Sequence, residues 1–186
     1  TSLLSHPKLT ERERAAMRAA ETRCCDTFSA LGGDIIEYPQ FRGAAEPHHF
    51  PPCLFVRGNK SILDGPTIAI VGTRTCTPYG KAVAKRFAAD LAAAGLTVIS
   101  GGAFGIDAAA HEGALEAGGH TVAVLPCGAD VYYPPSHRPL LDEIAQRGLL
   151  VSPFALGAKA RDHSFLQRNA VIAALADTLL LVEVPA

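Results

Sequence analysis

The stretch from 98 to 134, VISGGAFGIDAAAHEGALEAGGHTVAVLPCGADVYYP, decides the fold of this chain. Its apolar start belongs to a run over 97–100, which leads through a glycine-rich turn into an alanine-rich segment, 106–117, that ends at Gly118. A second apolar run, 121–125, follows. An apolar run, a glycine-bearing turn, an amphipathic helix and another apolar run make a βαβ unit. The stretch therefore predicts two strands of a parallel sheet joined by a helix.

The same order recurs on both sides of this stretch. Further strands are predicted at 67–71, 149–152 and 178–184, and further helices at 78–94, 137–147 and 165–176. Most of the apolar runs are continuous, as is typical of strands that are buried on both faces of a sheet. The pattern predicts an α/β protein with a doubly wound, largely parallel sheet.

The segment before residue 64 has a different character. A capping box, Thr10 with Glu13, predicts a first helix that runs to the Gly32-Gly33 pair. The proline-rich segment 39–52 reads as an extended connector that is held by the apolar residues 54–56. We expect residues 1–63 to form an N-terminal helix and connector, and residues 64–186 to form the main domain.

Composition limits the possible classes of protein. The chain has 186 residues, 48% of them hydrophobic, and 17 Lys and Arg against 18 Asp and Glu leave a net charge of -1. These values predict a compact domain without a global attraction to nucleic acid or anionic membranes. The five cysteines are an odd set without zinc-ligand spacing, which is typical of reduced thiols. We expect a soluble, cytoplasmic protein that does not span a membrane and is a fragment of a longer chain.

The candidate binding residues lie in the loops that follow the predicted strands. Ligands of such sheets bind outside the carboxyl ends of the strands, where helix N-termini favour phosphate groups. The loops begin at Gly72, Ser100, Pro126 and Ser152. Five basic residues fall in or beside them: Arg74, Arg138, Lys159, Arg161 and Arg168. The pattern indicates a phosphate-binding edge, although Arg168 could instead pair with an acid such as Asp162.

Other chemistries receive little support from the residues. The turn 100–107 resembles a dinucleotide fingerprint, but Ser100 stands where the first glycine belongs, and the acid expected near Leu125 is missing. We therefore expect no cofactor. The pair His48-His49 lacks further ligands at a suitable spacing for a metal. Asp107 and His111 fit a hydrogen bond that orients the loop better than an acid/base pair, and Cys76 and Cys127 have no paired base.

A specific set of motifs resembles the DNA-processing protein A family, also called Smf. They extend through nearly the whole chain and are, in order, Tyr38-Pro39, Pro51-Pro52 with Leu-Phe-Val-Arg-Gly-Asn (54 to 59), IAIVGTR (68 to 74), Tyr79-Gly80, the stretch 98–134, residues 148–152, Phe165, Arg168-Asn169 and Val182-Glu183. The resemblance implies an extended Rossmann-like fold that binds single-stranded DNA and hands it to the RecA recombinase in natural transformation or recombination. It also implies that no reaction is catalysed, and that the full-length protein is a homodimer.

The resemblance also implies roles for individual residues. Arg74 matches a phosphate contact, and Arg168-Asn169 matches an Arg-Asn pair of the family. Arg138 falls where relatives carry basic DNA contacts. The turn that matches the glycine-rich wall of the family's pocket contributes Ser100, Gly101, Gly102, Phe104 and Gly105.

This chain departs from the family pattern at several positions. Phe104 stands where relatives usually carry Arg or Lys, so the pocket loses one charge and Phe104 is available to stack on a base. The family's Ser-Gly-x-Leu-x-Thr segment, expected after Glu183, is missing, and with it the strands that support dimerisation in relatives.

Two alternatives share the predicted fold. The lysine-decarboxylase-like family of nucleotide phosphoribohydrolases has a similar glycine-rich loop, but its Pro-Gly-Gly-x-Gly-Thr signature with a following Glu is not found at Pro126. A nucleotide-sensing module without DNA binding is the other alternative, because the same pocket would hold one mononucleotide.

Overall fold

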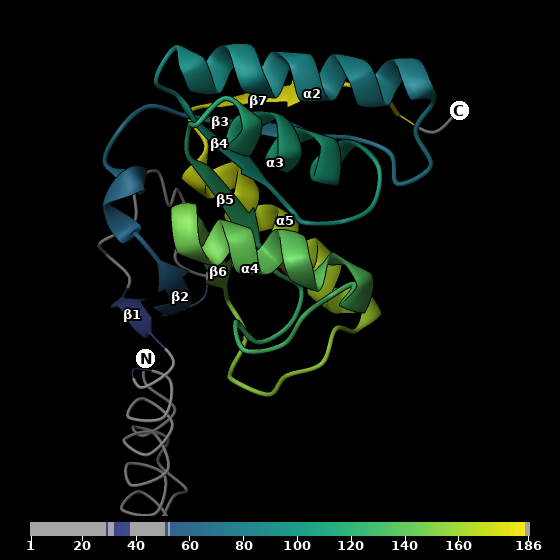
Figure 1. Ribbon diagram of the computed structural model, residues 1–186. Helices are drawn as coiled ribbons and strands as arrows, with labels where there is room; N and C mark the ends of the chain where they lie inside the picture. Colours follow the sequence, from purple (N-terminus) through teal and green to yellow (C-terminus); the bar gives the residue numbers. More distant parts are fainter. Residues whose placement is uncertain (1–28, 30–31, 38–50, 52, 185–186) are drawn as a thin grey trace, which may run out of the picture.

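The computed structural model describes residues 29, 32–37, 51 and 53–184 (Figure 1). The helix predicted from Thr10 and most of the connector at 39–52 lie outside the described residues. No helix in the described part of the chain is long and apolar enough to cross a bilayer.

A seven-stranded mixed sheet forms the centre of the molecule, in the order β1-β2-β6-β5-β4-β3-β7. Five strands are parallel to one another: β3 (Thr67–Val71), β4 (Thr97–Ser100), β5 (Thr121–Val124), β6 (Leu149–Ser152) and β7 (Thr178–Leu181). The prediction of a doubly wound, largely parallel sheet is confirmed, and each of the five predicted runs contains one of these strands.

Two antiparallel strands extend the sheet beyond β6. β2 (Cys53–Gly58) pairs with β6, and β1 (Gly33–Glu37) pairs with β2. Leu54 and Val56, which were expected to hold the connector, are buried in the core on β2. A short 3-10 helix, η2 (Lys60–Leu63), then leads to β3.

Helices cover both faces of the sheet because its strands are apolar on both sides. α2 (Pro78–Ala93), α3 (Ile106–Glu116) and α4 (Arg138–Arg147) lie on one face, and α5 (Asp162–Leu175) lies on the other (Figure 1). Alternate residues of the strands enter different core clusters. Ala69, Ile99 and Val151 pack with α5, whereas their neighbours contact α2, α3 and α4. A short 3-10 helix, η3 (Pro135–His137), precedes α4.

The chain connections on the two sides of β3 run in opposite directions across the sheet. The chain leaves β3 through α2 toward β4 on one side, whereas α5 returns the chain to β7 on the other side. In sheets of this kind the crevice outside the carboxyl ends at such a switch point is the usual ligand site.

β7 departs from the expected burial on both faces. It has a strand neighbour on one side, and Leu179 and Leu181 are 59% and 54% exposed. Its continuous apolar sequence therefore does not indicate a central strand. The run was predicted to reach residue 184, but β7 ends at Leu181.

Candidate nucleic-acid interface

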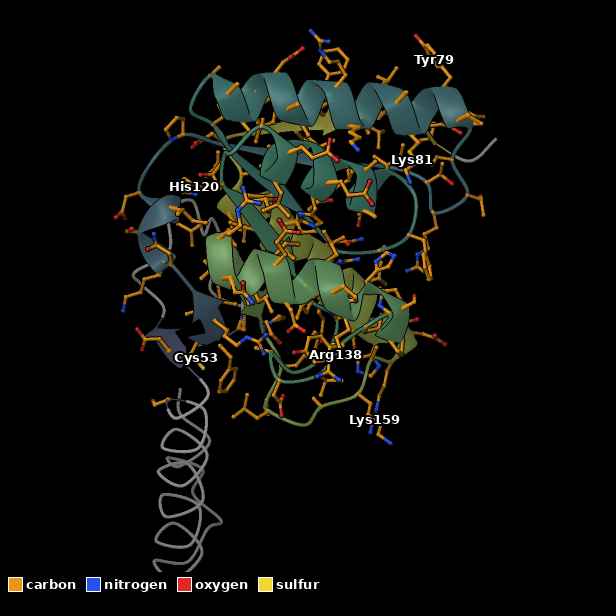
Figure 2. The ribbon with its side chains drawn as sticks, viewed as in Figure 1. Cys53, Tyr79, Lys81, His120, Arg138 and Lys159 are labelled. Atoms are coloured by element: carbon orange, nitrogen blue, oxygen red, sulfur yellow. The ribbon has the colours of Figure 1, made fainter. Side chains whose placement is uncertain are left out.

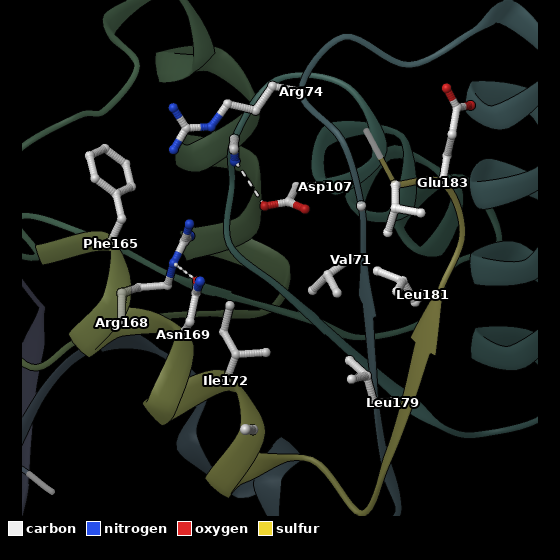
Figure 3. Close-up of a pocket in the computed structure, with 14 residues that line it drawn as sticks. Val71, Arg74, Asp107, Phe165, Arg168, Asn169, Ile172, Leu179, Leu181 and Glu183 are labelled. Atoms are coloured by element: carbon white, nitrogen blue, oxygen red, sulfur yellow. Dashed lines mark hydrogen bonds between the residues drawn. The ribbon is translucent and has the colours of Figure 1, made fainter. Parts of the chain in front are cut away.

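A cavity of about 390 Å³ lies at the switch point between the carboxyl ends of β3 and β7 and the first turns of α5 (Figure 3). Its apolar wall comes from β7 and the middle of α5, and its polar wall comes from the loops. The lining includes Arg74, Ala103, Asp107, Phe165, Arg168, Asn169, Ile172, Leu179, Leu181 and Glu183. Residues far apart in the sequence thus meet here because parallel strands bring their carboxyl ends to one edge.

Arg74 lies at the cavity on the loop that follows β3. Its side chain is exposed, and the guanidinium carbon is 4.6 Å from the centre of the Phe165 ring (Figure 3). Within the described ranges, no carboxylate forms a salt bridge with Arg74. A cation that is held by an aromatic ring and has no anionic partner is suited to bind a phosphate.

Arg168 has a different environment from Arg74. It is only 4% exposed, and its Nη1 donates hydrogen bonds to the carbonyl oxygens of Gly101 and, at 2.9 Å, Val124. Its Nε donates to Oδ1 of Asn169 at 3.1 Å. Burial lowers the pKa of the guanidinium, and the nearby Asp107 opposes that shift. Arg168 therefore forms the floor of the cavity and ties α5 to the loop after β4 and to the end of β5.

The glycine at 101 makes this arrangement possible. A Cβ there would collide with the Arg168 guanidinium, so a side chain at position 101 would displace that guanidinium. The alternative partner, Asp162, forms no salt bridge with Arg168 among the described residues.

Asp107 lines the cavity from α3, and His111 lies one turn further along the same helix. Asp107 is 5% exposed and accepts a hydrogen bond from the backbone N–H of Ala103 at 3.4 Å (Figure 3). Burial raises the pKa of this carboxyl, while Arg168 opposes the shift. The contact with Ala103 fits the expected orienting role better than acid/base chemistry.

His111 is fully buried, and burial lowers its pKa to about 3, so the ring is neutral at physiological pH. Oγ1 of Thr121 donates to the carbonyl of Val98 at 2.8 Å and is 2.7 Å from Nδ1 of His111. This assigns the ring proton to Nδ1, which donates to Thr121. In the described part of the chain, Nε2 has no hydrogen-bond partner. A neutral, enclosed imidazole is poorly placed to exchange protons with a ligand.

The glycine-rich turn contributes mainly backbone to the site. Oγ of Ser100 donates to the carbonyl of Ile70 at 2.7 Å and is buried, as are Gly101 and Gly102. Gly105, half-buried, has a φ of 78°, and a Cβ there would lie 2.7 Å from the carbonyl oxygen of Arg74. Phe104 is the exposed member of the predicted set in this turn.

The outer basic residues lie away from the cavity. Nε of Arg138 is 3.6 Å from Asp142, whose other oxygen accepts from Arg57 at 3.1 Å and from the hydroxyl of Tyr132. The Tyr132 hydrogen bond, together with Arg57, lowers the pKa of Asp142. Arg138 is thus partly neutralised, although its side chain is 68% exposed.

Lys159 and Arg161 are exposed on the loop before α5. That loop is fixed to the one after β5, because Gly128 N–H donates to Ala158 at 2.9 Å and Gly157 N–H donates to the Asp130 carboxylate at 2.9 Å. Figure 2 places Arg138 and Lys159 at the side of the molecule away from Tyr79 on α2. The predicted set therefore divides into a cavity group around Arg74 and an outer group of three cations.

Glu183 supports the site, although the sequence analysis predicted no role for this residue. Its carboxylate accepts hydrogen bonds from the N–H and Oγ1 of Thr77 at 3.1 and 2.9 Å, and its carbonyl accepts from the N–H of Thr73 at 2.8 Å. Glu183 thereby fixes both ends of the loop that carries Arg74. The Val182-Glu183 motif was the available signal, but the contact spans 106 positions and is invisible to local patterns.

Cys127 is poorly suited to act as a nucleophile. Cys127 is buried, its thiol donates to the carbonyl of Val131 at 3.2 Å, and burial together with Asp130 raises its pKa to about 12. A thiol with that pKa is not ionised at neutral pH. Among the described residues, no cluster of three His, Cys, Asp or Glu side chains suits a metal ion; His48 and His49 lie outside them.

The fold and this edge define a Rossmann-like α/β protein with a cavity lined by cationic and aromatic side chains at the switch point of its sheet. Residues 29–186 match the family model of DNA recombination-mediator protein A, and the chain belongs to that family.

Curated relatives agree with this assignment. The chain is 49% identical over 155 residues to a putative DNA processing protein DprA of Mycobacterium tuberculosis, which covers 80% of this chain and 40% of the relative. It is 36% identical over 139 residues to DNA processing protein DprA of Streptococcus pneumoniae, and the match covers 75% of this chain and 49% of that relative. The chain therefore spans less than half the length of these two relatives.

Two solved structures share the fold. DNA processing protein A from Helicobacter pylori, described for its single-stranded DNA binding mode, superposes with a TM-score of 0.73 at 34% identity, covering 82% of this chain and 69% of that one. DprA from Streptococcus pneumoniae superposes with a TM-score of 0.71 at 29% identity, and the match covers 91% of this chain and 62% of that one.

Proposed function

We propose that this chain binds single-stranded DNA with little sequence preference through the edge that carries Arg74, and that the full-length protein presents the strand to a RecA recombinase. The observation that carries the proposal is the exposed Arg74 guanidinium, which lies over Phe165 at the cavity and has no carboxylate partner among the described residues. The Helicobacter pylori relative, described as binding single-stranded DNA, supports the same ligand class.

The chemistry of the edge favours a single strand over a duplex. Arginine and backbone N–H groups contact phosphates without reading sequence, and aromatic faces stack on any unpaired base. The bases of a duplex are stacked on one another, so Phe165 and the apolar wall of the cavity would gain little from them. The outer cations Arg138, Lys159 and Arg161 extend the positive edge along which a strand would run.

We propose a binding protein without catalysis. The acid/base candidate His111 is enclosed and neutral, and the nucleophile candidate Cys127 is a buried, protonated thiol. The loop at Pro126 also lacks the carboxylate of the phosphoribohydrolase signature. Release of a free base from a nucleoside monophosphate, lost on substitution of cavity residues, would contradict this part of the proposal.

The partners of the full-length protein belong to the same proposal. The family description as a recombination mediator supports transfer of the strand to a RecA recombinase. Self-association of the full-length protein is proposed from the resemblance of its sequence. Co-sedimentation with RecA on DNA, and the molar mass of the full-length protein in solution, test these two partners separately.

Titration of labelled ligands at several salt concentrations tests the proposed function. We expect a single-stranded oligonucleotide to bind more tightly than a duplex of the same length or a mononucleotide. If about four phosphates are neutralised, the slope of log affinity against log salt is roughly -3, at about -0.7 per phosphate. A flat salt profile, equal affinity for duplex, or tighter binding of the mononucleotide would refute it.

A further inference from the structure

Phe104 is an exposed aromatic side chain on the turn between β4 and α3. Half of its surface is accessible, whereas the neighbouring Gly102 and Ile106 are buried. Gly102 and Gly105 have φ values of 68° and 78°, conformations that suit glycine. The turn that they form leaves the Phe104 ring at the carboxyl edge of the sheet. Phe104 thus exposes an aromatic ring between the loops that carry Arg74 and Arg138.

His137 holds the Phe104 ring in place. The two ring centres are 4.5 Å apart and the planes are inclined by 73°, which is an edge-to-face contact. Nδ1 of His137 lies 3.0 Å from the carbonyl oxygen of Gly102, to which it donates. The imidazole is thus fixed to the same turn that carries Phe104. A ring that is already oriented loses less conformational freedom when a ligand stacks on it.

The Phe104 turn adjoins the loop of Arg74. The N–H of Ile106 donates to the carbonyl of Thr73 at 3.3 Å, and a Cβ on Gly105 would lie 2.7 Å from the Arg74 carbonyl oxygen. On the other side, Arg138 follows His137 directly in the chain. A nucleotide whose phosphate contacts Arg74 would therefore place a neighbouring base within reach of Phe104.

We propose that Phe104, supported by His137, is a stacking surface for one unpaired nucleobase next to the cavity. The inference rests on the proposed function and adds to it a second ligand position, outside the cavity lining, that is aromatic instead of cationic. Stacking on this ring requires a base and no charge, so it contributes affinity that is tolerant of sequence and insensitive to salt.

The test compares Phe104→Ala, Phe104→Leu and Phe104→Trp with the unchanged chain, using a labelled oligothymidylate at several salt concentrations. Because Phe104 is half exposed, all three variants should keep the thermal midpoint of the unchanged chain. We expect Phe104→Ala and Phe104→Leu to weaken binding by roughly 5- to 150-fold while the salt slope stays unchanged. Phe104→Trp should retain the affinity of the unchanged chain. Leu is the matched control, since it is apolar but has no π-face.

A second arm uses the same oligonucleotide with abasic sites. The unchanged chain should bind it more weakly, and Phe104→Ala should cause no further loss, because the removed base and the removed ring belong to one interaction. The inference is overturned if Phe104→Ala binds as tightly as the unchanged chain, if Leu retains affinity, or if the salt slope falls. If the unchanged chain binds no single-stranded DNA, the proposed function itself has failed.

Discussion

Arg74 and Arg168 show how residues of one type acquire different roles. Both arginines were expected to contact phosphate, and both line the cavity. Arg74 is exposed and contacts an aromatic ring, whereas the Arg168 guanidinium is buried and hydrogen-bonded to backbone carbonyls. The number of hydrogen-bond donors still free for a ligand is therefore larger on Arg74. Exposure and existing partners decide which of the two is available to DNA.

Arg74→Ala should weaken binding of single-stranded DNA without affecting folding. Loss of one phosphate contact should cost on the order of 1 to 3 kcal/mol of binding free energy and make the salt slope shallower by about 0.7. Oligonucleotide titration at several salt concentrations, beside the thermal midpoint, measures both effects. Arg86→Ala is the matched control, because Arg86 is an exposed arginine on α2 that pairs with Asp90. Equal affinities of the two variants would exclude Arg74 from the interface.

Arg168→Ala should mainly reduce stability. It leaves the carbonyls of Gly101 and Val124 without their donor and the Asp107 carboxyl without its neighbouring cation. Removal of one member of such a buried set should lower the free energy of unfolding by about 3 kcal/mol. Denaturant unfolding measures the loss, and Arg161→Ala, an exposed cation before the same helix, should leave stability nearly unchanged. A loss below about 1 kcal/mol for Arg168→Ala would show that the buried contacts are dispensable.

At the scale of elements, the site depends on how the loop after β3 is held. Glu183 binds Thr73 and Thr77 from the end of β7, and the turn before α3 packs against the same loop through Gly105. Two segments distant in the sequence thus position the loop of Arg74. These contacts are made by backbone atoms and by the Glu183 carboxylate.

Gly105→Ala should disturb this loop, and Gly118→Ala provides the control. Both glycines have positive φ, 78° and 74°, so a side chain strains the backbone at either position. At Gly105 the ψ of -122° also lies outside the left-handed helical region, which adds to the strain there. A Cβ at Gly118 meets nothing within 4 Å, whereas one at Gly105 would approach the carbonyls of Thr73 and Arg74. We expect a greater loss of stability for Gly105→Ala, and weaker DNA binding in that variant alone. Identical unfolding and binding curves for the two variants would show that the contact of Gly105 with the Arg74 loop contributes neither to stability nor to DNA binding.

At the scale of the whole molecule, folding is coupled to pH through the core. His111 is enclosed between α3 and the sheet, and its pKa is lowered to about 3 from the ordinary value of 6.5. Because the folded pKa is the lower one, the unfolded chain takes up a proton below pH 6.5 that the folded chain does not. His111 therefore destabilises the fold progressively as the pH falls from 6.5 toward 3.

The free energy of unfolding should fall by about 2 kcal/mol between pH 7 and pH 5 on account of His111, at about 1.4 kcal/mol per unit below 6.5. The raised pKa of Asp107 acts in the opposite direction in its own window above 3.8, because there the folded chain holds the proton more tightly. His111→Asn isolates the histidine, since its amide can still donate to Thr121. In denaturant unfolding, the free energy of unfolding of the variant should change less between the two pH values than that of the unchanged chain. An equal change in both proteins would show that the pKa of His111 is the same in the folded and unfolded chain.

The sequence by itself determined the fold class, the family and the positions of the five parallel strands. These properties follow from local information: the apolar run at 121–125 and the glycine-bearing turn after Ser100 need only their own neighbours to be recognised. The loops that carry the candidate residues were also predictable, because the carboxyl ends of parallel strands share one edge of the sheet.

Only the tertiary structure decided what each side chain does at that edge. The burial of Arg168 depends on Gly101, which lies 67 positions earlier, and the Arg74 loop depends on Glu183 after the last strand. The exposure of Leu179 follows from the place of β7 at the margin of the sheet, although its apolar sequence is typical of a central strand. These outcomes follow from the order of strands in space, which brings distant residues into contact and which no local pattern of residues encodes.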